Sequence, residues 1–556
     1  MKKLMIILMT AIPMLVIAQN KVNVNVDSVG KLATKITVDQ KFKISELTVS
    51  GPLNGADLKL LQEIVNRTKI NKDNPGECLV TAVDISGITI VEGKEGIKTN
   101  TNELPKGMFS GAKSLTRAVL PTCLQVVSEN CFSGCEKLID VTIPASVTTI
   151  KNEAFQNCES LTAITLPAGL LAIESEAFEG CENLTAIDLP SGLTEIAVQA
   201  FSKCKALSRI NIPNGVKKIG GSAFLSCKSL KELILPPSVK EIESAAFEGC
   251  ENLENIQMAS VEKVGASAFH ECKNLQSASF DDLDKIGQLA FGGCKRLEQV
   301  VIKGNLTDIN TAAFKGCISL RNITVPASVK TISSHAFDGC KALETFEFPS
   351  SLTKVNDCAF EDCASLKSVE LPNMLKSLGD DAFRGCASLE TVTINGFIDE
   401  IEPNTFRDCS SLQKIVLPTS IKRIGSNAFL GCTTLSEINL PIVLQSIEDA
   451  AFERCGSLTT LTLPVSLKSI GGDAFKECTS LTSVELPASL KKIGGSAFQK
   501  CLSLREVIVN CPTPPSISGD TFKGVKATFI IPRGTQQAYA LNKKWAKVAG
   551  LKEKTN

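Results

Sequence analysis

Cysteine is the residue type with the widest chemical potential in this sequence. The chain has 22 cysteines among 556 residues, but only two histidines, His270 and His335. Thiols form disulfides, ligate metals and act as nucleophiles. Seventeen of the cysteines recur at one fixed position of a repeat, from Cys135 to Cys501, so they must be interpreted as a set.

This cysteine column predicts packing rather than reactivity. Stacked strands place equivalent residues about 4.8 Å apart, which does not forbid disulfides. The odd number of cysteines and their apolar neighbours favour reduced, buried thiols. One ligand per repeat does not assemble a tetrahedral metal site. Five cysteines lie outside the column, and among them Cys123 and Cys131 are the best candidates for chemistry; the set is Cys78, Cys123, Cys131, Cys358 and Cys511.

No catalytic constellation follows from the other reactive residues. Both histidines stand beside repeat phenylalanines in variable positions, which indicates exposed or half-exposed residues rather than catalysis. Asp281, Asp282 and Asp284 resemble part of a calcium loop but lack its glycine and its terminal glutamate. We therefore expect no enzyme activity and no catalytic, cofactor or metal site.

A repeat of about 23 residues positions all of these side chains. Its anchor is a phenylalanine, followed after three residues by cysteine (Ala112 in the first unit) and after six by leucine. The anchors are Phe109, Phe132, Phe155, Phe178, Phe201, Phe224, Phe247, Phe269, Phe291, Phe314, Phe337, Phe360, Phe383, Phe406, Phe429, Phe452, Phe475 and Phe498. A fixed period of this length predicts a solenoid, because one unit cannot bury its apolar face alone. Each unit should form one turn of the solenoid, which we call a rung.

The segment 178–200 shows the pattern of one rung. Leu184, Ile187 and Leu189 have the spacing of a leucine-rich repeat and predict a short strand, which Pro190 ends. Residues 193–196 predict a second short strand on the opposite face. The pattern resembles the BspA-like (Treponema-type) leucine-rich repeats of bacterial surface proteins. This resemblance implies a parallel-β solenoid of about 18 rungs, with an α/β N-terminal cap and a small C-terminal cap.

The remaining segments fit a secreted repeat protein. Residues 1–18 have two lysines before an apolar run and predict a signal peptide. We expect an N-terminal cap region at 19–104, with a short helix from Asp57 to Arg67 and an imperfect first rung in strands 79–85 and 88–91. The repeat array should span 105–510. The C-terminal cap should span 511–556, with a strand and a helix.

Charge and surface composition narrow the partners. Lys plus Arg and Asp plus Glu both number 59, which argues against nucleic acid and anionic membrane, and no segment after the signal predicts membrane insertion. One outward column alternates in sign and is expected to pair internally; it consists of Glu298, Arg321, Glu344, Lys367 and Glu390. The stretches that flank it carry no aromatic side chain. These residues are candidates for broad, polar contact.

Two function classes remain open. The resemblance implies a secreted or cell-surface binding protein, attached to host matrix proteins such as fibronectin or fibrinogen, or to other cells. The alternative is a glycan- or nutrient-binding surface module, which the missing aromatic residues disfavour. Extracellular, cell-surface and periplasmic locations are all compatible with the signal peptide.

One irregularity interrupts the array. The units that start at Phe247 and Phe269 have 22 residues, and the proline after the strand is replaced in three successive units, by Ala259, Asp281 and Lys303. We expect altered turns at this place. A tolerated deletion explains the change, and the alternative is a docking patch that exposes Asp281, Asp282 and Asp284.

Overall fold

The computed structural model describes residues 20–69 and 79–555. The chain divides into two compact units, Met1–Leu184 and Thr185–Asn556. The predicted signal peptide lies outside the described residues. No helix in the described part of the chain is long and apolar enough to cross a membrane.

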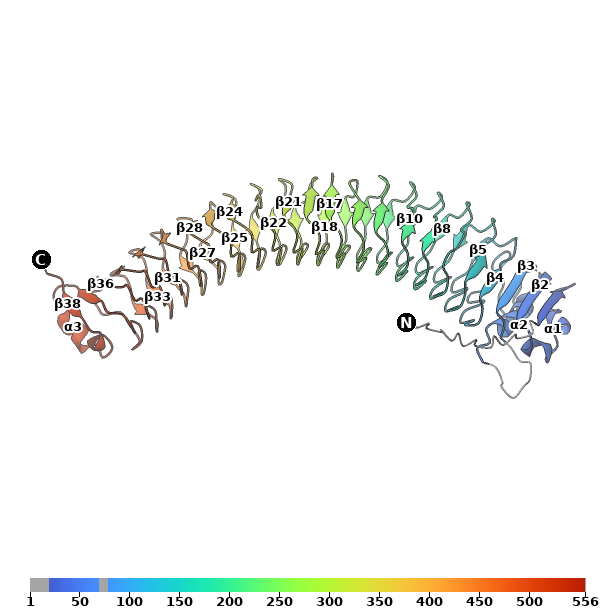
Figure 1. Cartoon of the computed structure of the whole chain (residues 1–556), viewed down its shortest axis with the longest axis horizontal. Helices are drawn as coiled ribbons and strands as arrows, with labels where there is room; N and C mark the ends of the chain where they lie inside the picture. Colours follow the sequence, from blue (N-terminus) through green and yellow to red (C-terminus); the bar gives the residue numbers. More distant parts are fainter. Residues whose placement is uncertain (1–19, 70–78, 556) are drawn as a thin grey trace, which may run out of the picture. The chain divides into compact units, whose positions relative to one another are not determined.

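Unit 1 joins a helical cap to the first rungs (Figure 1). Its elements are β1 (Lys21–Asn25), α1 (Leu32–Lys35), η1 (Gln40–Phe42), β2 (Glu46–Leu53), α2 (Gly55–Val65), β3 (Ala82–Ile90), β4 (Arg117–Val119), β5 (Val126–Val127), β6 (Asp140–Thr142), β7 (Thr149–Ile150) and β8 (Ala172–Ile173). The parallel sheets have the orders β1-β2-β3-β4-β6 and β5-β7-β8.

The cap of unit 1 differs from the expectation in one respect. Helix α2 is confirmed, and Asn54 and Asp57 form a capping box at its start. The expectation of two short strands at 79–85 and 88–91 is wrong, because Ala82–Ile90 forms the single strand β3. This strand is long because it pairs with the eight-residue strand β2 over most of its length.

Unit 2 is a parallel-β solenoid in which two short strands alternate along the chain, except in the rung of Phe337, where residues 343–349 form no first strand. The strands that follow the repeat leucine are β9 (Ala186–Ile187), β11 (Arg209–Ile210), β13 (Glu232–Ile234), β15 (Asn255–Gln257), β17 (Ser277–Phe280), β19 (Gln299–Ile302), β21 (Asn322–Thr324), β24 (Ser368–Leu371), β26 (Thr391–Ile394), β28 (Lys414–Val416), β30 (Glu437–Ile438), β32 (Thr460–Thr462), β34 (Ser483–Leu486) and β36 (Glu506–Val509).

The second strands of unit 2 follow the exit turn of each rung. They are β10 (Glu195–Ile196), β12 (Lys218–Ile219), β14 (Glu241–Ile242), β16 (Lys263–Val264), β18 (Lys285–Ile286), β20 (Asp308–Ile309), β22 (Thr331–Ile332), β23 (Lys354–Val355), β25 (Ser377–Leu378), β27 (Glu400–Ile401), β29 (Arg423–Ile424), β31 (Ser446–Ile447), β33 (Ser469–Ile470) and β35 (Lys492–Ile493). Equivalent residues pair in parallel register, for example Ile196 with Ile219.

The core of unit 2 is built from the repeat columns. Successive phenylalanine rings stack with centroids between 5.1 and 5.7 Å apart. Phe314, for example, is fully buried between Phe291 and Phe337. The cysteine and leucine columns are buried beside this ladder. The repeat therefore places every remaining side chain at a predictable position on a rigid frame.

The C-terminal end of unit 2 closes the array with β37 (Thr528–Ile531), α3 (Gln536–Leu541), η2 (Trp545–Lys547) and β38 (Leu551–Glu553). The expected strand and helix are present, and β38 adds a further parallel strand. The Tyr539 hydroxyl donates to the carbonyl of Cys511, and Trp545 Nε1 donates to the carbonyl of Pro515. Both side chains are buried and attach the cap to the segment after the last repeat.

Candidate binding surface

The outward column of alternating charge, from Glu298 to Glu390, forms the predicted ion pairs in its central part. Glu344 accepts from Lys367 at 2.8 Å and lies 3.8 Å from Arg321. Hydrogen bonding to Lys367, with its charge, lowers the pKa of Glu344. All three side chains are largely exposed, so each pair contributes little stability. The charges of this column mainly compensate one another, and a binding role for Glu298 and Glu390 remains a prediction.

The aspartates of the irregular rungs are exposed, but one of them is paired. Asp281, Asp282 and Asp284 all have solvent-accessible side chains. Lys303 lies 3.0 Å from Asp281 and stands one rung further along. Lys303 and Asp281 occupy two of the positions that lost the repeat proline. The docking role of this patch remains a prediction.

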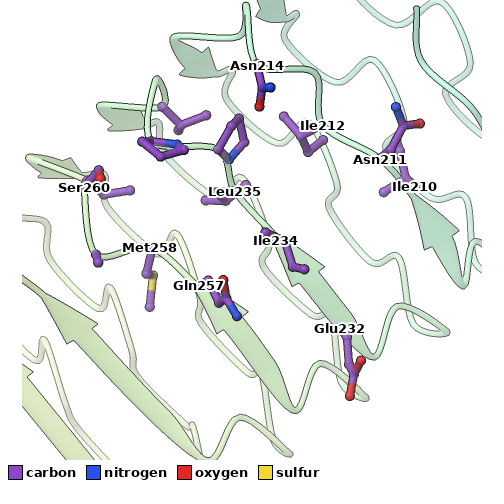
Figure 2. A pocket seen from close by; sticks show the side chains of 15 residues that line it. Ile210, Asn211, Ile212, Asn214, Glu232, Ile234, Leu235, Gln257, Met258 and Ser260 are labelled. Carbon is purple, nitrogen blue, oxygen red and sulfur yellow. The ribbon is translucent and has the colours of Figure 1, made fainter.

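A groove of about 630 Å³ opens on unit 2 beside these rungs (Figure 2). Its apolar lining includes Ile212, Ile234, Leu235 and Met258. Ile234 is 66% exposed, although it belongs to strand β13. Polar side chains also line the groove, namely Asn211, Asn214, Glu232, Gln257 and Ser260. An apolar base with a few polar groups is the usual character of a recognition site.

The groove coincides with a shortened turn. In the regular rung, the N–H of Val239 donates to the carbonyl of Pro236 after the strand has ended. In the next rung, the N–H of Val261 donates to the carbonyl of Met258. The turn there begins one residue earlier because a residue is missing. The predicted change of turn geometry is thus present, and the step between unequal turns lies within the groove lining.

Further apolar side chains are exposed on the loops that follow other first strands. Phe397 is 81% exposed after β26, and Ile442 and Val465 are also exposed in the equivalent loops. Aromatic residues of the first strands, such as Phe280 in β17, are buried rather than outward-facing, and the prediction did not extend to the loops. Single exposed apolar side chains of this kind are common on protein surfaces.

The cysteine column is buried, and its thiols have a specific partner. From Cys227 to Cys501, each Sγ donates to the main-chain carbonyl of a phenylalanine in the preceding rung, at 3.1–3.3 Å. Burial raises the pKa of these thiols, for example to about 12 for Cys250. Outside the column, Cys131 and Cys511 are buried, Cys123 and Cys358 are partly exposed, and Cys78 lies outside the described residues.

The two histidines have different surroundings. His270 is partly exposed and lies 3.5 Å from Glu248. His335 Nδ1 lies 3.0 Å from Asp338, and His335 forms a close group with Cys358 and Glu361. This group was not predicted from the sequence, because each of its residues was considered alone. The signal that could have revealed it is the repeat period, because His335 and Cys358 are 23 residues apart and therefore stack.

The sequence model of the BspA type leucine rich repeat region matches residues 102–231, 195–321, 284–413, 330–455 and 399–528, with six copies. The chain therefore belongs to the BspA-type leucine-rich-repeat family. Among curated proteins, none matches this chain.

Several solved structures are similar. A leucine-rich repeat protein from Bacteroides ovatus is 23% identical, with 85% of this chain and 92% of that chain covered and a TM-score of 0.36. A leucine rich cell surface protein from Faecalibacterium prausnitzii is also 23% identical, with 59% and 83% covered and a TM-score of 0.32. The pneumococcal vaccine antigen PcpA is 19% identical, with 70% and 92% covered and a TM-score of 0.34.

Proposed function

We propose that this protein is a secreted or cell-surface, non-enzymatic binding protein that recognises another protein. The matrix proteins and surface proteins of host or neighbouring cells are the partners that fit this proposal. Membership of the BspA-type family supports a role in binding. The groove beside Ile234 is the proposed centre of contact.

The exposure of Ile234 carries this proposal. A strand residue that alternates outward would ordinarily be polar in this array, as Asn211 and Gln257 are at the equivalent positions of the adjacent rungs. Ile234 instead exposes an apolar side chain in a groove that Leu235 and Met258 also line. Burying such a side chain in a complex contributes about 1.5–3 kcal/mol. The groove thus offers one apolar anchor surrounded by hydrogen-bonding groups.

The same lining favours a protein partner over a glycan. No aromatic residue lines the groove. Sugar rings commonly bind against aromatic faces, whereas protein interfaces combine an apolar centre with a polar rim. A glycan- or nutrient-binding role therefore remains the second candidate, favoured only by the polar groups Asn214, Gln257 and Ser260.

A binding screen with one matched pair of variants tests the proposal. The purified chain is applied to immobilised fibronectin, fibrinogen, other matrix proteins, intact bacterial cells and a glycan array. Ile234→Glu should weaken protein binding by at least about tenfold, because the charge would be buried in the contact. Ile442→Glu makes the same change at an exposed isoleucine outside the groove and should leave binding unchanged. Binding to glycans alone would contradict the proposal.

A further inference from the structure

Two adjacent rungs of unit 2 bring four metal-ligating residue types together. His335 and Asp338 belong to one turn, and Cys358 and Glu361 occupy the same two positions of the next turn. Nitrogen, sulfur and oxygen donor atoms of His335, Cys358 and Glu361 all lie within 4.8 Å of one another. The three side chains are partly buried.

The backbone holds these residues in equivalent geometry. His335 and Cys358 both have positive φ, 58° and 55°. Their N–H groups donate to the carbonyls of Asp357 and Asp380 in the following rungs, at 3.0 and 2.9 Å. Each also accepts, through its carbonyl, from the residue three positions later. The solenoid therefore presents the imidazole and the thiol from stacked positions of a rigid edge.

Asp338 orients the imidazole for ligation. Its carboxylate lies 3.0 Å from His335 Nδ1 and is only 16% exposed. A histidine that ligates a metal usually donates its other ring N–H to a carboxylate, which fixes the tautomer. With Nδ1 hydrogen-bonded to Asp338, His335 Nε2 is the nitrogen available as a ligand. Asp338 is thus a positioning residue.

The local charges suit a divalent cation. Asp338, Glu361 and Asp381 face Lys315 and Arg384, which pair with them at 2.8–3.5 Å. Three carboxylates against two cations leave one negative charge, and a Cys358 thiolate would add a second. Arg384 contacts Oε1 of Glu361, and a carboxylate can use its second oxygen for a metal. A bound divalent ion would neutralise this group.

We propose that His335 Nε2, Cys358 Sγ and a carboxylate oxygen of Glu361 form a zinc-binding site. Mixed nitrogen, sulfur and oxygen ligands suit Zn²⁺, and three protein ligands leave a fourth position for water. Tetrahedral zinc requires its ligand atoms to lie about 3.3–3.8 Å apart, so small side-chain rotations complete the site. The Cys358 thiol loses its proton to solvent as the Zn–S bond forms.

Metal titration of the full chain without a histidine tag tests the site. We expect one equivalent of Zn²⁺ to bind, and Co²⁺ to give a thiolate-to-metal charge-transfer absorption. Cys358→Ala should abolish that absorption and weaken zinc binding by more than about 100-fold, while His335→Asn and Asp338→Asn should each weaken it by about 10–100-fold. The repeat already carries alanine at this position in Ala312 and asparagine in Asn404, both with positive φ, so these variants should fold.

Two matched controls separate the site from adventitious binding. His270→Asn removes the other histidine, and Cys123→Ala removes the other partly exposed off-column cysteine among the described residues. Both variants should bind zinc like the unmodified chain. The proposal is overturned if the full chain takes up no zinc, if Cys358→Ala binds Co²⁺ with the same absorption, or if either control loses the metal.

Discussion

The thiol of Cys340 donates a hydrogen bond to the main-chain carbonyl of Phe314, 26 residues earlier, at 3.2 Å. The same carbonyl accepts from the N–H of Cys317 within its own rung, at 3.1 Å. The column cysteine therefore fills the second acceptor site of a buried carbonyl. The first unit has Ala112 at this position, and no repeat phenylalanine precedes Phe109, so the carbonyl of an earlier anchor is absent there.

Replacing Cys340 by alanine should lower the free energy of unfolding by about 1–2 kcal/mol. The substitution removes one hydrogen bond to a buried carbonyl and leaves a small void. Chemical denaturation of the variant beside the unmodified chain measures this change. Ala112→Cys is the matched control and should give no gain in stability. A loss below about 0.3 kcal/mol for Cys340→Ala would mean that the thiol only fills space.

Alkaline pH should destabilise the protein through the same column. Burial raises the pKa of Cys317 and Cys250 to about 12 in the folded chain, whereas unfolded thiols titrate near about 8.5. This contribution to stability is complete below about pH 8.5 and is lost as the pH rises toward about 12, by up to about 1.4 kcal/mol per thiol and pH unit. Thermal unfolding from about pH 8 to pH 10 measures the slope, which should be smaller in Cys317→Ala.

Alkylation provides the control for that experiment. Few column thiols should react in the folded protein, and most should react in denaturant without a reductant. A requirement for reductant would show that the column is oxidised and would remove the basis of the alkaline transition.

Phe314→Ala should destabilise unit 2 by about 3–5 kcal/mol. The ring is fully buried, with neighbouring ring centroids 5.5 and 5.4 Å away, and the stacked backbone cannot collapse into the space. Denaturant unfolding measures the change. Phe397→Ala, at a residue that is 81% exposed, should change stability by less than about 0.5 kcal/mol. Equal effects of the two substitutions would contradict the assignment of the core ladder.

The position two residues after each anchor phenylalanine carries glycine in some rungs and a side chain in others. Replacing glycine by alanine and replacing serine by glycine at this position should change the free energy of unfolding in opposite directions. Ser226 has a φ of 58°, and Gly316 has a φ of 72° at the equivalent position. Gly316→Ala should destabilise by about 1 kcal/mol, because its Cβ has space but its backbone is left-handed. Ser226→Gly should be neutral or stabilising by up to about 1 kcal/mol. Thermal unfolding of both variants checks the signs.

Much of the fold follows from the sequence because each position of the repeat has the same structural role in every rung. The anchor, cysteine and leucine positions predicted the core, whereas the strand that Pro190 was expected to end stops earlier, at Ile187. The N-terminal strand β3 was divided incorrectly because its length depends on pairing with β2, which the repeat does not encode.

The candidate sites were harder to predict because they depend on neighbours in the stack. The pairing of Arg321, Glu344 and Lys367 could be predicted from one aligned column. The group around His335 and Cys358 requires two columns to be aligned at once, since each rung supplies two of its residues. The groove borders the shortened turn, and the exposure of its side chains is a matter of three-dimensional packing that the repeat pattern does not give.

Restoring the regular turn in the irregular rungs should reduce protein binding at the groove. The variant carries Ala259→Pro and Asp281→Pro, with one residue inserted after each, so that both exit turns regain the length of the turn after Pro236. The loop beside Met258 should then extend as in neighbouring rungs and remove the step in the lining, which lowers affinity for the partner found in the screen. Binding measurements and thermal unfolding together check this outcome. The control inserts one residue after Gly534, in the C-terminal cap, and should bind normally. Unchanged affinity in the folded repaired variant would show that the short turns are a tolerated deletion, and that neither the groove nor the Asp281 patch has a binding role.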